Sequence, residues 1–418
     1  MSKPHIITGL DIGTGSIKVL SALKKPGEED FEVLGRVQVP SFGIRKGVVV
    51  DIPKVAEIVS SLIEKTKQES KKKINDVYAS IGGGHISCTS SRGLVSVSRA
   101  DQKISEEDIN RVIQAAKTFS LPSNKEIIDI FPREFIVDGE KGIKEAVGME
   151  GVRLEADVLI LCCFSPYLRN STQAILNAGF QINDLIPTPL ASSRAVLTPR
   201  EKELGAVLID VGAGTTSMAV FEEGGVIDVA IFPIGSGHIT NDIAVCLKTD
   251  IDTAERIKLE FGSCRSSRTK KSSKKEKKMN KLSRHDRVEI KIEGEEPLVF
   301  SQKMLSEIVE ARVCEIFNLV NKELKKISRQ GLLPAGIVLT GGGVKLPAIK
   351  ELAKKELKLP CRIGIPRQFS SLPKDPSFSA LCGLIMQGFD IEIEERSRAG
   401  FGRGFGNKIK KVFKIFIP

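Results

Sequence analysis

Short runs in which apolar and polar residues alternate recur through the first eighty residues, and this period of two predicts β-strands. After Pro53, apolar residues recur at helical spacing and predict a helix before the last of these strands. The first part of the chain therefore predicts the order β-β-β-α-β. The predicted strands are 6–19, which a glycine-rich turn interrupts, and 33–39, 47–50 and 77–81.

A similar order starts again at Ala206, which predicts a second half built like the first. A predicted helix at 190–197 joins the two halves. The 418 residues are enough for two or three domains, and the alternation of strands and helices predicts an α/β fold. The second half is predicted to contain strands at 206–220, 226–232 and 337–340 and helices within 302–329.

Residues 85–163 lie between strands of the first half and predict an inserted unit. Its helix begins at Ser105, because Ser105 and Asp108 have the spacing of a helix cap and apolar residues follow at helical intervals. Strand patterns at 133–137 and 158–163 flank this helix. A helix within 171–178 and a strand at 182–186 then return the chain to the first half.

The net charge of +11 is concentrated in two short segments. Residues 264–287 carry +9 and residues 403–418 carry +5, so the rest of the chain carries −3. The segment 263–287 is rich in Ser and Lys, which predicts a solvated loop. It lacks aromatic residues and regular spacing, so no nucleic-acid partner is expected. The eight cysteines form no CxxC pair and the four histidines are scattered, which argues against a zinc site.

The pattern D-[IV]-G-x-G-[ST] occurs twice, at Asp11–Ser16 and at Asp210–Thr215. Each copy follows an apolar strand and precedes another, which predicts a hairpin turn. Glycines let backbone N–H groups approach an anion closely, and the Ser or Thr adds a hydroxyl donor. An Asp at the end of a strand can hold water around Mg²⁺. Two such loops in two similar halves predict a site that grips a polyphosphate from both sides.

A third glycine cluster, Gly341-Gly342-Gly343, follows the predicted strand 337–340 and precedes a helix that begins near Pro347. Its backbone could approach a nucleoside or its phosphates. The chain contains neither a Walker A loop nor a Rossmann fingerprint, so these phosphate-binding folds are not indicated.

The two phosphate loops, the connecting helix 190–197, the loop 337–343 and a second connecting helix at 378–386 resemble the actin-like ATPase superfamily. Within it, the chain resembles the FtsA family of bacterial cell-division proteins. The residues that carry this second resemblance are Ile86-Ser87-Cys88, 148–153, Leu190–Ser193, 337–342 and the C-terminal segment.

The resemblance implies an α/β, duplicated actin-like fold with two halves around a nucleotide cleft and an inserted, family-specific subdomain 1C. The implied subdomains are 1A at 1–84 and 164–198, 1C at 85–163, 2A at 199–224 and 326–392, and 2B at 225–325 with the basic loop 263–287, followed by a flexible linker at 393–406 and an amphipathic membrane-targeting helix at 407–418.

The resemblance also implies ATP with Mg²⁺ between the halves, with Asp11 and Asp210 holding Mg²⁺ through water. Glu255 and Lys258 would bond the ribose, although an i,i+3 surface ion pair is the alternative interpretation. The implied nucleotide-binding residues are Asp11, Gly13, Thr14, Gly15, Ser16, Lys18, Asp210, Gly212, Gly214, Thr215, Thr216, Glu255, Lys258, Gly341, Gly342 and Gly343.

Related ATPases place a Glu or Gln on the first connecting segment to orient the attacking water. Residues 186–192 contain neither, so hydrolysis is expected to be slow at best and no catalytic residue is assigned. The alternatives on the same fold are a sugar-kinase-like phosphotransferase and a pilus-assembly homologue. No catalytic Asp can be assigned for the kinase, and a terminal membrane-binding helix is unexpected for it.

The family implies self-association into filaments, other division proteins as partners, and binding of the C-terminal tail of the tubulin homologue FtsZ. Arg312, on the predicted helix 302–329, stands where the family offers a basic residue to that tail. An ordinary exposed helix arginine is the alternative interpretation.

The C-terminal segment 405–417 has an apolar stripe and a basic face when it is placed on a helical wheel. This pattern predicts an interfacial helix on an anionic membrane surface. The expected location is the cytoplasmic face of the bacterial inner membrane, at the division site. The apolar stripe comprises Phe405, Ile409, Val412, Phe413 and Phe416, and the basic face comprises Lys408, Lys410, Lys411 and Lys414.

Overall fold

A computed structural model describes the chain except residues 1–4, 26, 119–120, 266–286, 291–296 and 400–418. The first half is a six-stranded sheet in the order β11-β6-β1-β2-β3-β19. Its N-terminal strands pair as consecutive antiparallel hairpins, and β1 also pairs in parallel with β6. The predicted order is confirmed here. The elements are β1 (His5–Ile12), β2 (Ser16–Lys24), β3 (Phe31–Pro40), β4 (Ile44–Arg45), β5 (Val48–Val49), α1 (Ile52–Ser70) and β6 (Asp76–Ile81).

The second half repeats this arrangement in a five-stranded sheet, β14-β13-β12-β17-β18. β12 pairs antiparallel with β13 and in parallel with β17, as β1 does with β2 and β6. The duplication predicted from the sequence is therefore present in the strand pairing. The elements are β12 (Ala206–Val211), β13 (Thr216–Glu222), β14 (Gly225–Phe232), β17 (Gly336–Thr340), the 3₁₀ turn η3 (Gly342–Lys345), α9 (Ile349–Leu357) and β18 (Cys361–Ile363).

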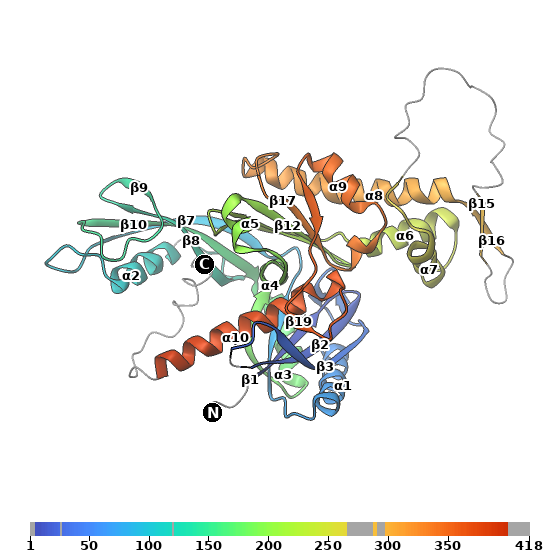
Figure 1. Cartoon of the computed structure of the whole chain (residues 1–418), viewed down its shortest axis with the longest axis horizontal. Helices are drawn as coiled ribbons and strands as arrows, with labels where there is room; N and C mark the ends of the chain where they lie inside the picture. Colours follow the sequence, from blue (N-terminus) through green and yellow to red (C-terminus); the bar gives the residue numbers. More distant parts are fainter. Residues whose placement is uncertain (1–4, 26, 119–120, 266–286, 291–296, 400–418) are drawn as a thin grey trace, which may run out of the picture.

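A helical lobe extends from the second half, on the right of Figure 1. The predicted helical region 302–329 is a single long helix, α8, which the Ser301 side chain caps. Most of the predicted basic loop 263–287 lies outside the described residues. The lobe contains α6 (Ser236–Leu247), α7 (Ile251–Phe261), β15 (Arg287–Ile290), β16 (Leu298–Ser301) and α8 (Gln302–Lys326).

The inserted unit forms its own sheet, β7-β10-β8-β9, on the opposite side of the molecule from the lobe (Figure 1). Its helix begins where predicted, because the Ser105 and Asp108 side chains form a capping box. The elements are β7 (Ser87–Ser96), α2 (Glu106–Lys117), β8 (Lys125–Val137), β9 (Glu140–Ile143) and β10 (Arg153–Phe164).

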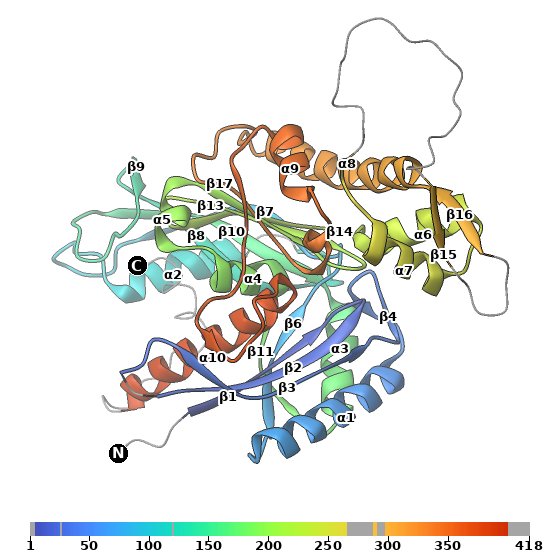
Figure 2. The ribbon, with the colours of Figure 1, turned by 45° about the vertical axis from the view of Figure 1, so that its right-hand side comes forward.

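Two helices, α4 and α10, pack against each other between the halves (Figure 2). Their backbones approach so closely that a Cβ at Gly383 would overlap the carbonyl of Ala191. The two helices therefore lie at the junction of the two halves. The remaining elements are α3 (Ser165–Asn177), β11 (Gln181–Pro187), α4 (Thr188–Val196), α5 (Pro199–Leu204), β19 (Phe369–Ser370), η4 (Pro376–Phe378) and α10 (Ser379–Ala399).

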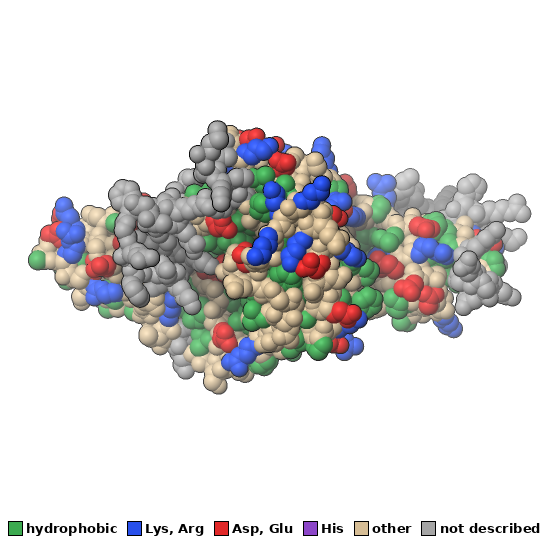
Figure 3. Space-filling model, turned by 90° about the horizontal axis from the view of Figure 1, so that it is seen from below, with side chains coloured by type: hydrophobic (Ala, Val, Ile, Leu, Met, Phe, Trp, Pro, Cys, Tyr) green, Lys and Arg blue, Asp and Glu red, His purple; other side chains and the backbone are tan. Residues whose placement is uncertain are grey.

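The prediction of a linker from residue 393 is wrong for 393–399, because α10 continues to Ala399. This stretch consists largely of Glu, Arg and other residues that tolerate a helix, and the first glycine comes only at 400. None of the described helices combines the length and the apolar composition that crossing a membrane requires. On the face seen in Figure 3, acidic and basic side chains are interspersed, as expected for a body without a large net charge.

Candidate functional site

The two predicted phosphate loops form the β1–β2 and β12–β13 hairpin turns. Both turns close in the same way: the amide of Gly13 donates to the Ser16 carbonyl at 3.2 Å, and that of Gly212 donates to the Thr215 carbonyl at 2.9 Å. Among the described residues, no hydrogen bond uses the amide of Gly15 or that of Gly214. These amides are therefore donors available to an anion.

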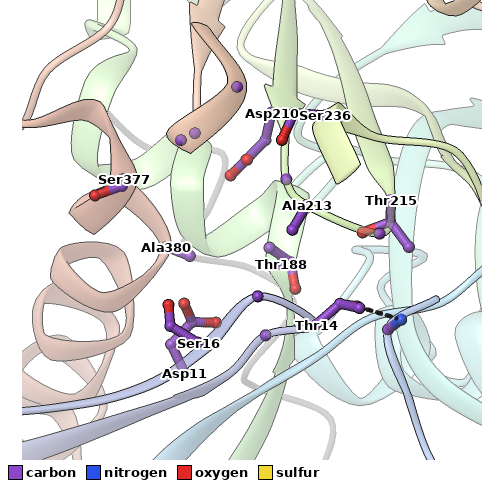
Figure 4. Close-up of a pocket in the computed structure, with 18 of the residues that line it drawn as sticks. Asp11, Thr14, Ser16, Thr188, Asp210, Ala213, Thr215, Ser236, Ser377 and Ala380 are labelled. Carbon is purple, nitrogen blue, oxygen red and sulfur yellow. Dashed lines mark hydrogen bonds between the residues drawn. The ribbon is translucent and has the colours of Figure 1, made fainter. Parts of the chain in front are cut away.

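The loops touch each other across the cleft between the halves (Figure 4). A Cβ at Gly214 would lie 2.6 Å from Cγ2 of Thr14, and one at Gly15 would lie 2.8 Å from Cβ of Ala213. Glycine is required at these two positions because any side chain would push the halves apart.

Beside this contact lies a cavity of about 500 Å³. It gathers the glycine cluster 341–343, Glu255 and Lys258 together with the two loops, although these segments are far apart in the sequence. The predicted residues that line it are Asp11, Gly13, Thr14, Gly15, Ser16, Lys18, Asp210, Gly212, Gly214, Thr215, Glu255, Lys258, Gly341, Gly342 and Gly343.

Thr216 is the one predicted nucleotide-binding residue that does not line the cavity. Its side chain is buried, and its hydroxyl donates to the carbonyl of Ile234 at 2.8 Å. Side chains alternate along a strand, so Thr215 and Ser217 can face the cavity while Thr216 cannot. The prediction for Thr216 is therefore wrong.

Asp11 is held in place from two sides. The hydroxyl of Ser80 donates to its Oδ1 at 2.8 Å, and Nζ of Lys18 donates to its Oδ2 at 3.2 Å. Nζ of Lys18 also donates to the carbonyl of Ser377, at 2.9 Å. The Asp11–Lys18 pair is mostly buried in the wall of the cavity, where the ammonium group balances the charge of the carboxylate.

Asp210 has no such cation partner within ion-pair distance among the described residues. Its Oδ2 accepts one hydrogen bond, from Ser192, and the carboxylate is buried. Burial, with a smaller effect of the Asp11 charge, raises the pKa of Asp210 to about 6. A cation in the cavity would favour its charged form.

Asp11 and Asp210 reach the cavity from opposite halves, which fits a divalent cation between them (Figure 4). Within the described ranges, no group of three or more Asp, Glu, His or Cys side chains could hold a metal ion directly. A Mg²⁺ ion readily keeps several waters and uses only one or two carboxylates together with phosphate oxygens. The carboxylates present fit that kind of site.

Glu255 and Lys258 form the i,i+3 ion pair of the alternative interpretation, but only Glu255 is exposed: 42% of its side chain is accessible, against 7% for Lys258. Nζ of Lys258 is buried and lies 2.6 Å from Oε2 of Glu255 and 2.9 Å from the Thr240 hydroxyl. Both side chains line the cavity. They are thus fixed polar groups in its wall.

Sequence reasoning missed several residues of the site. Ser80 and Ser192 orient the two carboxylates, and Leu259, Leu346 and Pro347 add an apolar part to the cavity next to Lys258. An apolar wall beside polar groups suits a flat aromatic base. Leu346 and Pro347 lie three and four residues after Gly343, so their closeness to the third glycine cluster in the sequence was a usable signal. Other lining residues are Gln38, Gly47, Gly82, Thr188, Ser236, Lys345, Ser377 and Ala380.

Arg312 lies on α8 in the lobe, away from the cavity, and is already paired. Its Nε and Nη2 bond both carboxylate oxygens of Asp242, at 2.6 and 2.7 Å, and Nη1 bonds Glu315. These partners raise the pKa of Arg312. An acidic ligand would have to compete with Asp242.

The predicted membrane-binding residues, 405–416, lie outside the described residues.

Two family models match the chain. The one described as Cell division protein FtsA matches residues 207–383, and the one described as SHS2 domain inserted in FTSA matches residues 83–162. The second match overlaps the predicted insertion.

Curated relatives match nearly the whole chain. Cell division protein FtsA of Borreliella burgdorferi is 34% identical over 415 residues, which covers 98% of this chain and 96% of the relative. The protein of the same name from Pseudomonas aeruginosa is 32% identical over 411 residues, with coverage of 97% and 95%.

Solved structures share the fold at low sequence identity. A PilM–PilN type IV pilus biogenesis complex matches with a TM-score of 0.64 and 16% identity, covering 91% of this chain and 98% of the matched chain. MreB5 of Spiroplasma citri bound to ADP matches with a TM-score of 0.52 and 14% identity, covering 94% and 98%. The predicted actin-like α/β fold with an inserted domain is confirmed.

Proposed function

Because the chain belongs to the FtsA family of cell-division proteins, we propose that it binds ATP with Mg²⁺ and polymerises on the cytoplasmic face of the membrane at the division site. There it tethers FtsZ filaments and recruits later division proteins. The observation that carries the nucleotide part is the meeting of both glycine hairpins, two carboxylates and Lys18 around one cavity.

The cavity offers a complementary group for each part of ATP. The free amides of the hairpins and Lys18 would hold the phosphates, Glu255 and Lys258 the ribose, and the apolar residues beside them the base. Asp11 and Asp210 would hold Mg²⁺ through water, and the ion would neutralise phosphate charge. MreB5 structures of the same fold contain ADP and AMPPNP, which supports the choice of ligand.

Calorimetry with ATP and with AMP tests this assignment. Since both hairpins would act on the β- and γ-phosphates, ATP with Mg²⁺ should bind at least about 100-fold more tightly than AMP, a difference of roughly 2.8 kcal/mol. Equal affinity for the two nucleotides, or no binding of ATP, would contradict the two-loop site.

The membrane part is supported by the sequence pattern of residues 405–417. Large apolar side chains on one face and lysines on the other suit reversible binding to anionic lipid. The full-length protein should co-sediment with anionic liposomes, while a protein ending at Arg403 should not. Equal sedimentation of the two would move the membrane contact elsewhere.

The FtsZ part is supported by family membership, which implies a basic residue for the FtsZ tail at the position of Arg312. The side chain is about one quarter exposed, so a partner's acidic tail could replace Glu315 or Asp242. Arg312→Glu should weaken binding of an FtsZ tail peptide at least about tenfold. Arg329→Glu is the matched control, because Arg329 also bonds a distant carboxylate through Nε and Nη2, that of Glu222, and is similarly exposed. Equal losses in the two variants would argue against a specific role.

Hydrolysis is expected to be slow. The segment that begins α4 presents Thr188 to the cavity, and its hydroxyl donates to the carbonyl of Ile81 at 3.1 Å. A threonine engaged in this way is a poor substitute for a carboxylate or amide that orients water. ATP would then act mainly as a switch for assembly.

A further inference from the structure

The inserted domain belongs to the first half by its position in the chain, yet it packs on the second half. Residues of β10 alternate: Ile160 and Cys162 face α2 inside the domain, whereas Leu161 and Cys163 face the other way. The second group joins one buried cluster with strands of the second half. That cluster includes Phe131, Leu159, Leu161 and Cys163 of the inserted domain and Leu208, Ala219, Phe221 and Val229 of the second half, each at most 2% exposed.

Polar contacts reinforce this interface. Nη2 of Arg133, on β8, donates to the carbonyl of Ile227 at 2.6 Å. The Cys88 thiol donates to the carbonyl of Val229 at 3.3 Å. At the edge, Nζ of Lys144 lies 2.8 Å from Glu223. The inserted domain is therefore attached to β14 and its turn by specific bonds as well as by apolar burial.

The same domain is also fixed to the first half. β10 ends at Phe164 and α3 begins at Ser165, so no loop separates them. α3 packs on α1, and Asn170 donates to the carbonyl of Val49 at 3.0 Å. At its other end, the chain enters the domain through Gly82, which lines the cavity.

We propose that the inserted domain braces the two halves and slows opening of the cleft, and thereby release of the bound nucleotide. This inference rests on the proposed ATP binding. The halves meet at the packed helices α4 and α10, and opening of the cleft must shift the second half relative to the first. A domain packed against both halves resists this shift, because its buried interface must shear or separate.

Two neighbouring residues of β10 offer a matched test. Leu161→Ala removes packing against the second half, while Ile160→Ala removes a similar volume inside the inserted domain; both side chains are fully buried. The release of a fluorescent ATP analogue is measured by chasing it with unlabelled ATP. Leu161→Ala should speed release about tenfold, and Ile160→Ala should leave it near the wild-type rate.

A second pair avoids large cavities. Arg133→Ala removes the bond to Ile227 and should also speed release several-fold. In Arg111→Ala, the lost bonds are to the Ser96 carbonyl and to the Asp108 carboxylate, both within the inserted domain, so release should not change. Circular dichroism checks that each variant is folded. If Arg133→Ala and Arg111→Ala bind the ATP analogue normally and release it at the same rate, the inserted domain is not a brace, and the proposed function is unaffected. If the wild type does not bind the analogue, both the proposed function and the brace are wrong.

Discussion

The two hairpin loops share one sequence pattern and one turn geometry, but they differ in how their carboxylates are balanced. Asp11 lies 3.2 Å from the ammonium of Lys18. Among the residues that the structure describes, Asp210 is bonded only by the hydroxyl of Ser192, and burial raises its pKa to about 6. The repeated motif therefore gives one carboxylate that is paired with a cation and one that has no cation partner within the described part of the chain.

The loops also differ in their support. The second is backed by the start of α6, where the amides of Ser236 and Gly237 each donate to a loop carbonyl at 2.8 Å. The first is backed by the segment before α1, through Gly47 donating to the Thr14 hydroxyl at 2.8 Å. The second loop is thus fixed by a helix, and the first by a neighbouring turn. The two copies of the motif therefore lie in different surroundings, although their own turn geometry is the same.

Gly214→Glu should have the largest effect. A side chain at this position meets Thr14 of the first loop, and the carboxylate adds negative charge where phosphates would bind. We expect ATP affinity to fall more than about 1000-fold, which corresponds to roughly 4 kcal/mol. Calorimetry measures the affinity, and thermal unfolding checks that the variant is folded. Tight binding by a folded variant would show that the loops do not hold the phosphates.

The charge difference between the loops predicts that replacing Asp210 or Asp11 by Asn will change the free energy of unfolding in opposite directions. The folded pKa of Asp210, about 6, is above its ordinary value of 3.8, so the folded state favours the protonated form. Protonated Asp210 does not destabilise the fold below pH 4. As pH rises through 6, the buried carboxylate ionises, and at pH 7.5 its charge lowers the free energy of unfolding. Asp210→Asn removes this cost and should stabilise the nucleotide-free protein by up to about 3 kcal/mol, while ATP affinity with Mg²⁺ falls about 10- to 100-fold.

Asp11→Asn is the comparison. It leaves the mostly buried Lys18 without its carboxylate partner, so the nucleotide-free protein should lose about 2–4 kcal/mol. Urea unfolding at pH 7.5 measures both changes. Destabilisation by both variants would show that Asp210, like Asp11, is held by a compensating charge.

The contact between the loops predicts that a second substitution can restore the ATP affinity lost by a first one. Gly15→Ala places a methyl group against Ala213, whose Cβ is the neighbour it would meet, at 2.8 Å. The loops must then separate, and ATP affinity should fall about tenfold, or 1.4 kcal/mol. Replacing Ala213 by Gly in the same protein should restore most of the affinity. If the double variant binds as poorly as Gly15→Ala, the loops do not set each other's position.

Features of the site that depend on local sequence could be predicted. The hairpins, the third glycine cluster and the pair Glu255–Lys258 each form within a few residues, and all of them line the cavity. Thr216 was implied by the family resemblance, but its side chain is turned away from the cavity because side chains alternate along a strand. Ser80 could not be found in this way, because it lies 69 residues from Asp11 and reaches it only through pairing of β6 with β1. Asp242 likewise lies 70 residues from Arg312.

The smallest predicted effect concerns Ser192, which donates the one hydrogen bond that Asp210 receives among the described residues. This bond favours the charged carboxylate, so Ser192→Ala should raise the pKa of Asp210 further. Wild-type affinity for ATP with Mg²⁺ should increase as pH rises through about 6, when Asp210 ionises. In Ser192→Ala the same increase should come at higher pH, with a loss of about two- to fivefold at pH 6.5 and little loss at pH 8. Calorimetry across this range measures the shift, and Ser193→Ala is the matched control because the Ser193 hydroxyl donates to the Leu190 carbonyl instead. Superimposable pH profiles for the two variants would mean that Asp210 stays charged without Ser192, and that the difference between the loops does not lie in the ionisation of this carboxylate.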